Sequence, residues 1–227
     1  MEKENVSISK GATVLDASGE KVLDYSFNQF EKYKIGSIPT EVIDNIVEHI
    51  DKLDLKWEKA LYGSKLDYDP RVRQSDIAWI SDEQVKNFVL SHFESANQDP
   101  DWQFDIDSME DVQYTVYNAS EKKDSADFLE TLDGHYEWHN DHIMTIEEPR
   151  RCRKLSMSIL LNQVDEDYEG GRIEFQVLRQ GNIDYDGITL NKGDILVFPS
   201  VMNHRVAPVV SGTRKVLVAW AWGLPFR

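Results

Sequence analysis

The stretch Lys154-Leu155-Ser156-Met157-Ser158-Ile159-Leu160-Leu161-Asn162 alternates apolar and small polar side chains over most of its length. Successive side chains of a β-strand point to opposite faces, so this period of two predicts a strand with one buried apolar face. Turns separate further apolar runs as far as the C-terminal end, namely residues 173–175, 195–198 and 216–222. Short strands between tight turns predict an antiparallel sandwich or barrel for this half of the chain.

The first hundred residues contain two helical patterns. After Pro39, apolar residues recur every three or four positions and predict a helix over residues 40–53. Ser81 and Gln84 have the spacing of a capping box and predict the start of a second helix. Its predicted buried stripe consists of Val85, Phe88, Val89 and Phe93.

Weaker strand patterns surround these helices. Residues 102–106 and 112–116 alternate, and the polar, acidic segment 118–134 predicts a loop. Short apolar patterns before residue 35 predict strands at Val6 and Ile8, at Val14 and Leu15, and at Val22 and Leu23. The fold class that follows is α+β and mostly β. We expect one domain over residues 1–227, with a strand and helix support region in 1–100 and the β core in 101–227.

Composition excludes several classes of protein. The 227 residues carry 25 basic and 41 acidic side chains, a net charge of -16, which makes nucleic acid an unfavourable partner. With Cys152 as its one cysteine, the chain has no internal disulfide and no cysteine-based zinc site. No apolar run is long enough to span a membrane, and no apolar stretch follows the N-terminal residues as in a signal peptide. We therefore expect a cytoplasmic protein.

Two histidines and one aspartate form the most informative constellation. His139 and Asp141 are two residues apart, and on a strand they would share one face. His204, after the apolar run that ends in Phe198, is the best third partner. Two histidines and one carboxylate form the facial triad of non-haem Fe(II) oxygenases, which leaves metal positions open. The alternative for His139 and Asp141 is a simple hydrogen bond at a strand end.

Arg214 follows His204 by ten residues. The intervening Ser211-Gly212 predicts a chain reversal that would place both residues on adjacent antiparallel strands. A buried arginine needs an anionic partner, and a guanidinium binds a carboxylate through two hydrogen bonds. A dicarboxylate that chelates iron at one end and pairs with Arg214 at the other fits this arrangement. The alternative is an exposed arginine on a strand.

These stretches, in this order, resemble the 2-oxoglutarate- and Fe(II)-dependent oxygenases, and among them the prolyl 4-hydroxylase-like catalytic domain. The resemblance is carried by residues 112–117, 134–141, 154–162, 169–175, 193–200 and 204–214, together with Trp220. The segments 40–53 and 73–79 are similar to the family more weakly. The departures are Arg214, where animal collagen-type enzymes have lysine, Val216, where some oxygenases have serine, and the longer segment 118–134.

The resemblance implies a double-stranded β-helix (jelly roll) with supporting N-terminal helices. It implies that His139, Asp141 and His204 bind Fe(II), that Arg214 pairs with the distal carboxylate of 2-oxoglutarate, and that Tyr117 donates a hydrogen bond to the same cosubstrate. O₂ is the oxidant, and ascorbate is a candidate reductant.

The implied reaction is hydroxylation of an unactivated C–H bond, on a prolyl or other residue of a peptide or protein, or on a small molecule. Two other functions stay open, a non-catalytic jelly-roll binding or sensor protein and a nucleic-acid demethylase. The segment 118–134 is either a substrate lid or a solvated loop. If its acidic side chains border the site, they would favour neutral or basic substrates.

Overall fold

The computed structural model describes residues 12–15, 21–25, 33–63, 67–100, 102–146, 148–179 and 182–225. Contacts divide the chain into two compact units, Met1–Lys32 and Tyr33–Arg227. In the first unit, two of the predicted strands are present, and β1 (Ala12–Leu15) pairs antiparallel with β2 (Lys21–Tyr25). The predicted strand at Val6 and Ile8 lies outside the described residues. The single-domain organisation stays a prediction.

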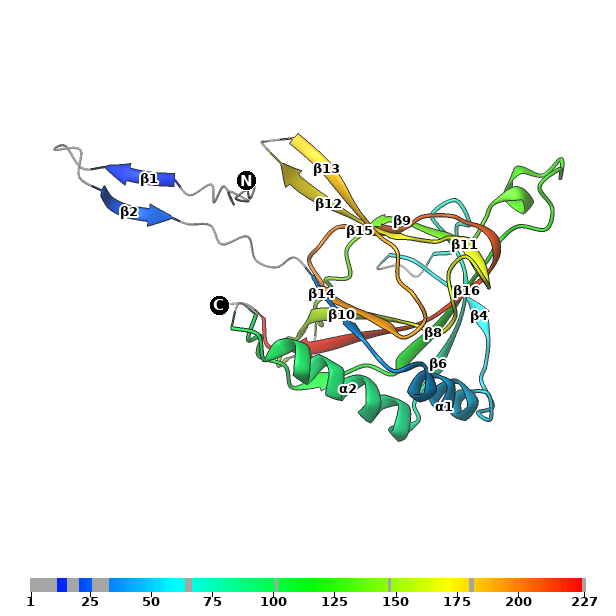
Figure 1. Cartoon of the computed structure of the whole chain (residues 1–227), viewed down its shortest axis with the longest axis horizontal. Coiled ribbons are helices and arrows are strands. Elements are labelled where there is room, and N and C mark those ends of the chain that lie inside the picture. Colours follow the sequence, from blue (N-terminus) through cyan, green and yellow to red (C-terminus); the bar gives the residue numbers. More distant parts are fainter. Residues whose placement is uncertain are drawn as a thin grey trace, which may run out of the picture. The chain divides into compact units, whose positions relative to one another are not determined.

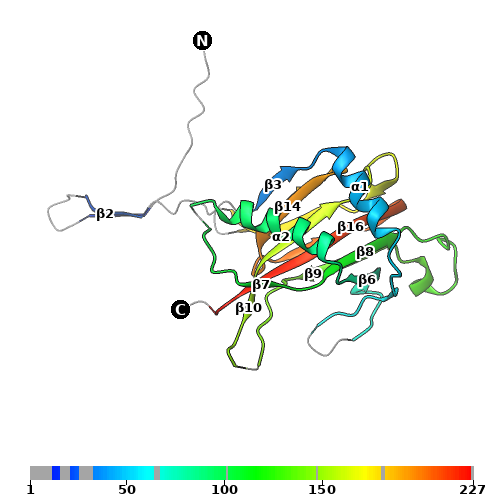
Figure 2. The ribbon, with the colours of Figure 1, turned by 90° about the horizontal axis from the view of Figure 1, so that it is seen from below.

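The second unit is built on a large antiparallel sheet with the strand order β3-β14-β10-β16-β8-β6-β4 (Figures 1 and 2). These strands are β3 (Lys34–Ser37), β14 (Asp194–Pro199), β10 (Cys152–Leu160), β16 (Val209–Gly223), β8 (Val112–Asn118), β6 (Asp76–Ile80) and β4 (Glu58–Lys59). Two short strands, β7 (Ser108–Met109) and β11 (Tyr168–Gly170), also pair with β16. The predicted strand at 154–162 is therefore a central strand, with neighbours on both sides.

A smaller sheet of five strands has the order β13-β12-β15-β9-β5. Its strands are β13 (Asn182–Ile188), β12 (Ile173–Arg179), β15 (His204–Val206), β9 (His135–His139) and β5 (Arg73–Gln74). Apolar side chains from both sheets form one core cluster, in which Phe175 of β12 meets Phe198 of β14 with ring centroids 5.0 Å apart. Two antiparallel sheets around one core are the architecture of the predicted jelly roll.

Two helices cover the outer face of the large sheet (Figure 2). The first, α1 (Thr40–Ile50), buries Ile43, Ile46 and Ile50 against it. The second, α2 (Glu83–Asn97), buries Val85, Val89 and Phe93, while Phe88 is half-buried. This outer core also takes up alternate side chains of β8 and β10, which leaves the other faces of both strands for the interior of the jelly roll. No helix within the described ranges is long and apolar enough to cross a membrane.

Two local predictions about these elements are wrong. The N-cap of α2 is Asp82, whose carboxylate accepts a hydrogen bond from the backbone N–H of Val85 at 3.0 Å, whereas the Ser81 hydroxyl donates to Asp111. Residues 102–106 form no strand. Gln103 has a left-handed backbone, and the Asn97 side chain binds both backbone polar groups of Phe104, so the alternating residues fold into a loop.

The predicted reversal at Ser211-Gly212 is also wrong. Strand β16 runs through both residues, and Gly212 stays in the sheet opposite Tyr168. Gly212 has a φ of +69°, and a side chain there would clash with the backbone of Asp167, so glycine allows two strands to approach closely. His204 and Arg214 consequently lie in different sheets, which face one another across the core.

Candidate active site

His139, Asp141 and His204 meet between the two sheets. His139 ends β9, His204 begins β15, and the two residues are paired across these strands. Asp141 lies beyond the end of β9, where its backbone N–H donates to the carbonyl of Ser200 at 2.9 Å. The Asp141 carboxylate oxygens are 3.6 Å from His139 Nε2 and 3.7 Å from His204 Nε2. One ligand atom from each residue lies within 4.8 Å of the others.

Backbone carbonyls hold both imidazoles in the orientation that a metal requires. Nδ1 of His139 is 2.7 Å from the carbonyl of Glu137, and Nδ1 of His204 is 3.0 Å from the carbonyl of Met202. A carbonyl can only accept, so Nδ1 carries the proton and Nε2 keeps its lone pair for a ligand.

The protonation states of the triad suit a cation. Burial, together with the neighbouring His204, lowers the pKa of His139 to about 3, so its ring is neutral near pH 7. Burial alone would raise the pKa of Asp141, but His204 and His139 outweigh it and hold this pKa at about 2. The site thus presents a neutral imidazole at His139, a buried carboxylate at Asp141 and, at His204, a second ring nitrogen that its backbone contact leaves free for a ligand. This donor set fits Fe(II) and leaves further metal positions open.

Arg214 and Tyr117 are neighbours on paired strands. They are directly opposite in the register of β16 and β8, and the Arg214 guanidinium carbon lies 5.5 Å from the centre of the Tyr117 ring. Arg214 is 2% exposed, and its Nε has no hydrogen-bond partner within the described part of the chain. A buried guanidinium with an unused donor is suited to an anion that enters from outside the protein.

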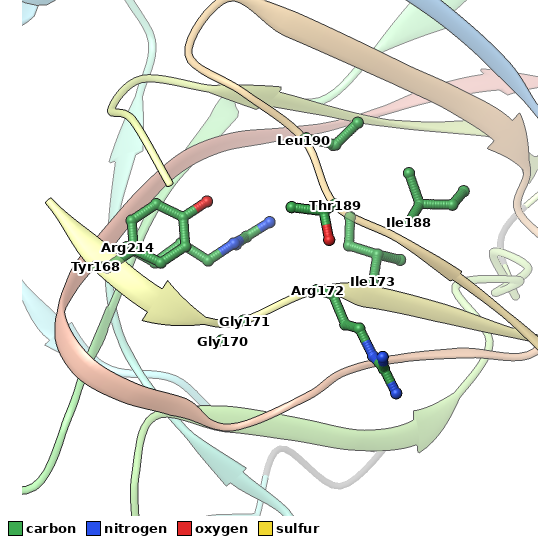
Figure 3. A pocket seen from close by; sticks show the side chains of 9 residues that line it. All are labelled: Tyr168, Gly170, Gly171, Arg172, Ile173, Ile188, Thr189, Leu190 and Arg214. Carbon is green, nitrogen blue, oxygen red and sulfur yellow. The ribbon is translucent and has the colours of Figure 1, made fainter. Parts of the chain in front are cut away.

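A small pocket contains the Arg214 side chain (Figure 3). Tyr168, Thr189 and Gly171 lie around it, and Ile173 borders both this pocket and the cavity that contains the triad. Gly171 has a φ of +62°, and a Cβ atom there would lie 2.7 Å from the Arg214 Cδ. Gly171, which follows directly after β11, therefore makes room for the arginine.

The triad opens into a cavity of about 510 Å³. Tyr117, Gln113 and Ser158 line it from the large sheet, and Trp79 and Trp220 add aromatic surface. Two arginines also line it, Arg73 and Arg153. The sequence pattern gives only a weak signal for these residues. Gln113 shares the strand face of Tyr117, but nothing in the spacing distinguishes a buried arginine from an exposed one.

The segment 118–134 does not line this cavity. It contains a short 3₁₀ helix, η1 (Phe128–Thr131), and part of it borders a separate cavity beside Lys59 and Asp76. Its lysines pair with its own acids, Lys122 with Glu130 at 2.6 Å and Lys123 with Asp133. Glu130 and Asp133 are thus paired with lysines of the same segment, and none of the segment's acids lines the cavity of the triad.

Residues 126–222 match the family model of the 2OG-Fe(II) oxygenase superfamily. A PKHD-type hydroxylase of Colwellia psychrerythraea is 36% identical over 90 residues, which are 40% of this chain and 38% of that relative. The match thus spans about two fifths of the relative's length. The residues that match the family model include the triad and Arg214.

Solved structures share the fold over most of the chain. A Pseudomonas putida prolyl-4-hydroxylase superposes with a TM-score of 0.59 at 16% identity, covering 86% of this chain and 94% of that one. A viral collagen prolyl hydroxylase from Paramecium Bursaria Chlorella virus-1, solved with 2OG, superposes with a TM-score of 0.58 at 17% identity. The superposition covers 86% of this chain and 97% of the viral one. A Trichoplax adhaerens prolyl hydroxylase, in complex with a hypoxia inducible factor peptide fragment, has a TM-score of 0.59 at 15% identity. The superposition covers 84% of this chain and 83% of that one.

Proposed function

We propose that this chain, which belongs to the 2OG-Fe(II) oxygenase superfamily and has a prolyl 4-hydroxylase-like fold, is a hydroxylase of unactivated C–H bonds. In the reaction, 2-oxoglutarate and O₂ are consumed, succinate and CO₂ are released, and one oxygen atom enters the substrate. The observation that carries the proposal is the joint presence of the triad and of the buried Arg214, whose Nε lacks a partner among the described residues.

His139, Asp141 and His204 would hold the metal through two Nε2 atoms and a carboxylate oxygen. Bound Fe(II) supplies the redox chemistry that couples decarboxylation of 2-oxoglutarate to hydroxylation. Arg214 would bind the distal carboxylate of the cosubstrate, and Tyr117, between the triad cavity and the guanidinium, would donate a hydrogen bond to it. Ile173 and the core aromatic rings around His204 exclude water from this side of the site.

The substrate is an amino-acid residue of a peptide or protein, or a small molecule. The support is the relatives' description as PKHD-type hydroxylases and the Trichoplax structure, which contains a peptide. Prolyl hydroxylation is the first reaction to test. A non-catalytic binding protein is less favoured, because this chain keeps all three candidate ligands and Arg214.

The test is succinate release from 2-oxoglutarate in the presence of Fe(II), with and without ascorbate, against proline-containing peptides and free amino acids. We expect succinate release that depends on Fe(II), and for a true substrate a product heavier by one oxygen atom. His142→Ala is the matched control, since His142 lies next to the motif but outside the triad. Absence of Fe(II)-dependent 2-oxoglutarate consumption under every condition would contradict the proposal.

A further inference from the structure

Arg73 is a second buried arginine of the candidate active site, and it is bound by neutral groups alone. The residue is 8% exposed. Its Nε donates to Ser75 Oγ at 3.1 Å, one Nη to Gln113 Oε1 at 2.9 Å, and the other Nη to the Leu61 carbonyl at 3.3 Å. Within the described ranges, no carboxylate forms an ion pair with it. These bonds use three of the five guanidinium N–H groups and fix the side chain in place.

The other arginine of the cavity is different. Arg153 forms two hydrogen bonds with the carboxylate of Glu110, at 2.5 and 2.7 Å, and lies over the Trp220 ring. Its charge is therefore already compensated. A buried charge without a counter-ion is costly, so the unpaired Arg73 marks, apart from the metal position, the place in this cavity where an anion would be most strongly stabilised.

Arg73 lies close to the triad. It is opposite Tyr136 in the pairing of β5 with β9, with its guanidinium carbon 4.5 Å from the Tyr136 ring centre. The Tyr136 ring in turn stacks on His139, with centroids 3.5 Å apart. The Tyr136 ring thus lies between the Arg73 guanidinium and His139, a candidate metal ligand. Arg73 also borders the cavity in which a reacting C–H bond must lie.

The cosubstrate does not account for Arg73. In the proposed function one end of 2-oxoglutarate binds at the triad and its single distal carboxylate binds Arg214, in the pocket behind Ile173. Arg73 lines the triad cavity and not that pocket. Arg214 and Arg73 are thus two buried guanidinium groups without a carboxylate partner among the described residues. Each is suited to an anionic group of a bound ligand, and the distal carboxylate of 2-oxoglutarate accounts for only one of them.

We propose that Arg73 binds a carboxylate of the substrate, so that the substrate class is a small carboxylic acid such as a free amino acid. The inference rests on the proposed function and narrows its substrate. The cavity of about 510 Å³ can enclose a ligand of this size. This charge preference is opposite to the one expected from the acidic segment 118–134, which lies outside the cavity lining.

The experiment compares each free L-amino acid with its carboxamide, which has nearly the same shape without the charge. Binding is measured by calorimetry to the full chain loaded with Mn(II) and saturating 2-oxoglutarate, where no turnover occurs. For at least one pair we expect the acid to bind wild type at least tenfold more tightly than the amide. Arg73→Met should remove this ratio, and Arg73→Lys should keep part of it, because the charge remains without the planar fork. Arg71→Met is the matched control, since Arg71 is exposed and pairs with Asp69.

The outcomes separate the two proposals. If 2-oxoglutarate itself fails to bind the Mn(II)-loaded wild type, the proposed function fails. If 2-oxoglutarate binds but no acid is preferred over its amide, only the role of Arg73 is overturned, and this comparison needs no variant to fold. An unchanged acid-to-amide ratio in a folded Arg73→Met protein, or equal weakening of both ligands, would mean that Arg73 only supports Tyr136.

Discussion

The side chains of His139, Asp141 and His204 each reach the site from a different local structure: a strand end, a loop and a strand start. Asp141→Ala and His204→Ala should each remove one ligand atom, and His204→Ala also removes ring contacts with Phe175 and Phe198. Substituting a residue that only hydrogen-bonds to a metal ligand lowers metal affinity roughly 10- to 100-fold, and we expect a larger fall when the ligand itself is removed. The measurement is bound Fe(II) per chain after anaerobic dialysis, with His142→Ala as the control. Full metal content in His204→Ala would exclude this histidine as a ligand.

Substitutions of Arg214 test the proposed binding of the distal carboxylate of 2-oxoglutarate. Arg214→Ala should weaken 2-oxoglutarate binding by roughly 2–5 kcal/mol, since it truncates one partner of a buried charge pair. Arg214→Lys should recover part of the loss, because an ammonium keeps the charge but not the two-pronged hydrogen bonding. Lys215→Ala, the exposed neighbour on the same strand, should change nothing. The measurement is the KM for 2-oxoglutarate in each of the three variants. An unchanged KM in Arg214→Ala would mean that another residue binds the distal carboxylate.

At the scale of elements, the link between β11 and β12 shapes the pocket of Arg214. Gly171→Ala places a methyl group 2.7 Å from Arg214 Cδ and 2.9 Å from Val209 Cγ2, in a backbone conformation that disfavours alanine. We expect a loss of stability of about 1–3 kcal/mol, as for other overpacked sites, and a raised KM for 2-oxoglutarate. Gly36→Ala is the control, because its Cβ would meet nothing within 4 Å. Equal KM values in Gly171→Ala and Gly36→Ala would show that the link between β11 and β12 does not position Arg214.

The start of α2 tests the corrected N-cap. Asp82→Ala should lower the free energy of unfolding by about 1 kcal/mol, and Ser81→Ala should have a smaller effect. The Val85 N–H and then His49 lower the pKa of Asp82 below its ordinary value of 3.8. Its stabilisation is therefore fully present above pH 3.8 and is lost as the pH falls through the lower folded-state pKa. Urea unfolding at neutral and acid pH measures this, and a larger effect of Ser81→Ala would restore the sequence-based assignment.

A comparison of the predicted and observed helices and strands shows which sequence patterns determine structure. Alternation in residues 154–162 and the helical spacing of Ile43, Ile46 and Ile50 predict these elements correctly, because burial against a sheet imposes the same period on any sequence. The same rule fails at residues 102–106, where side-chain hydrogen bonds from Asn97 replace strand pairing. Local turn propensity fails at Gly212, since a glycine that permits close strand approach has the same signature as one in a turn.

At the scale of the whole molecule, the sequence predicts which residues form the triad but not how they come together. The sequence predicts adjacent strands for His204 and Arg214, yet the two residues lie in facing sheets. Their distance along the chain carries no information on that arrangement. Arg73 is likewise invisible as a site residue, because its burial arises from β5 pairing with β9 more than sixty residues later. The roles of the triad, Arg214 and Tyr117 stay proposals, as does a requirement for ascorbate.

The central claim is that the triad and Arg214 bind opposite ends of one 2-oxoglutarate molecule across the two sheets. The most direct test is anaerobic titration of 2-oxoglutarate into wild type and Arg214→Ala, each with and without Fe(II). The account predicts tight binding only to wild type with Fe(II), weaker binding when either the metal or the guanidinium is removed, and the weakest binding when both are absent. Equal affinity for 2-oxoglutarate with and without Fe(II) in wild type would contradict it.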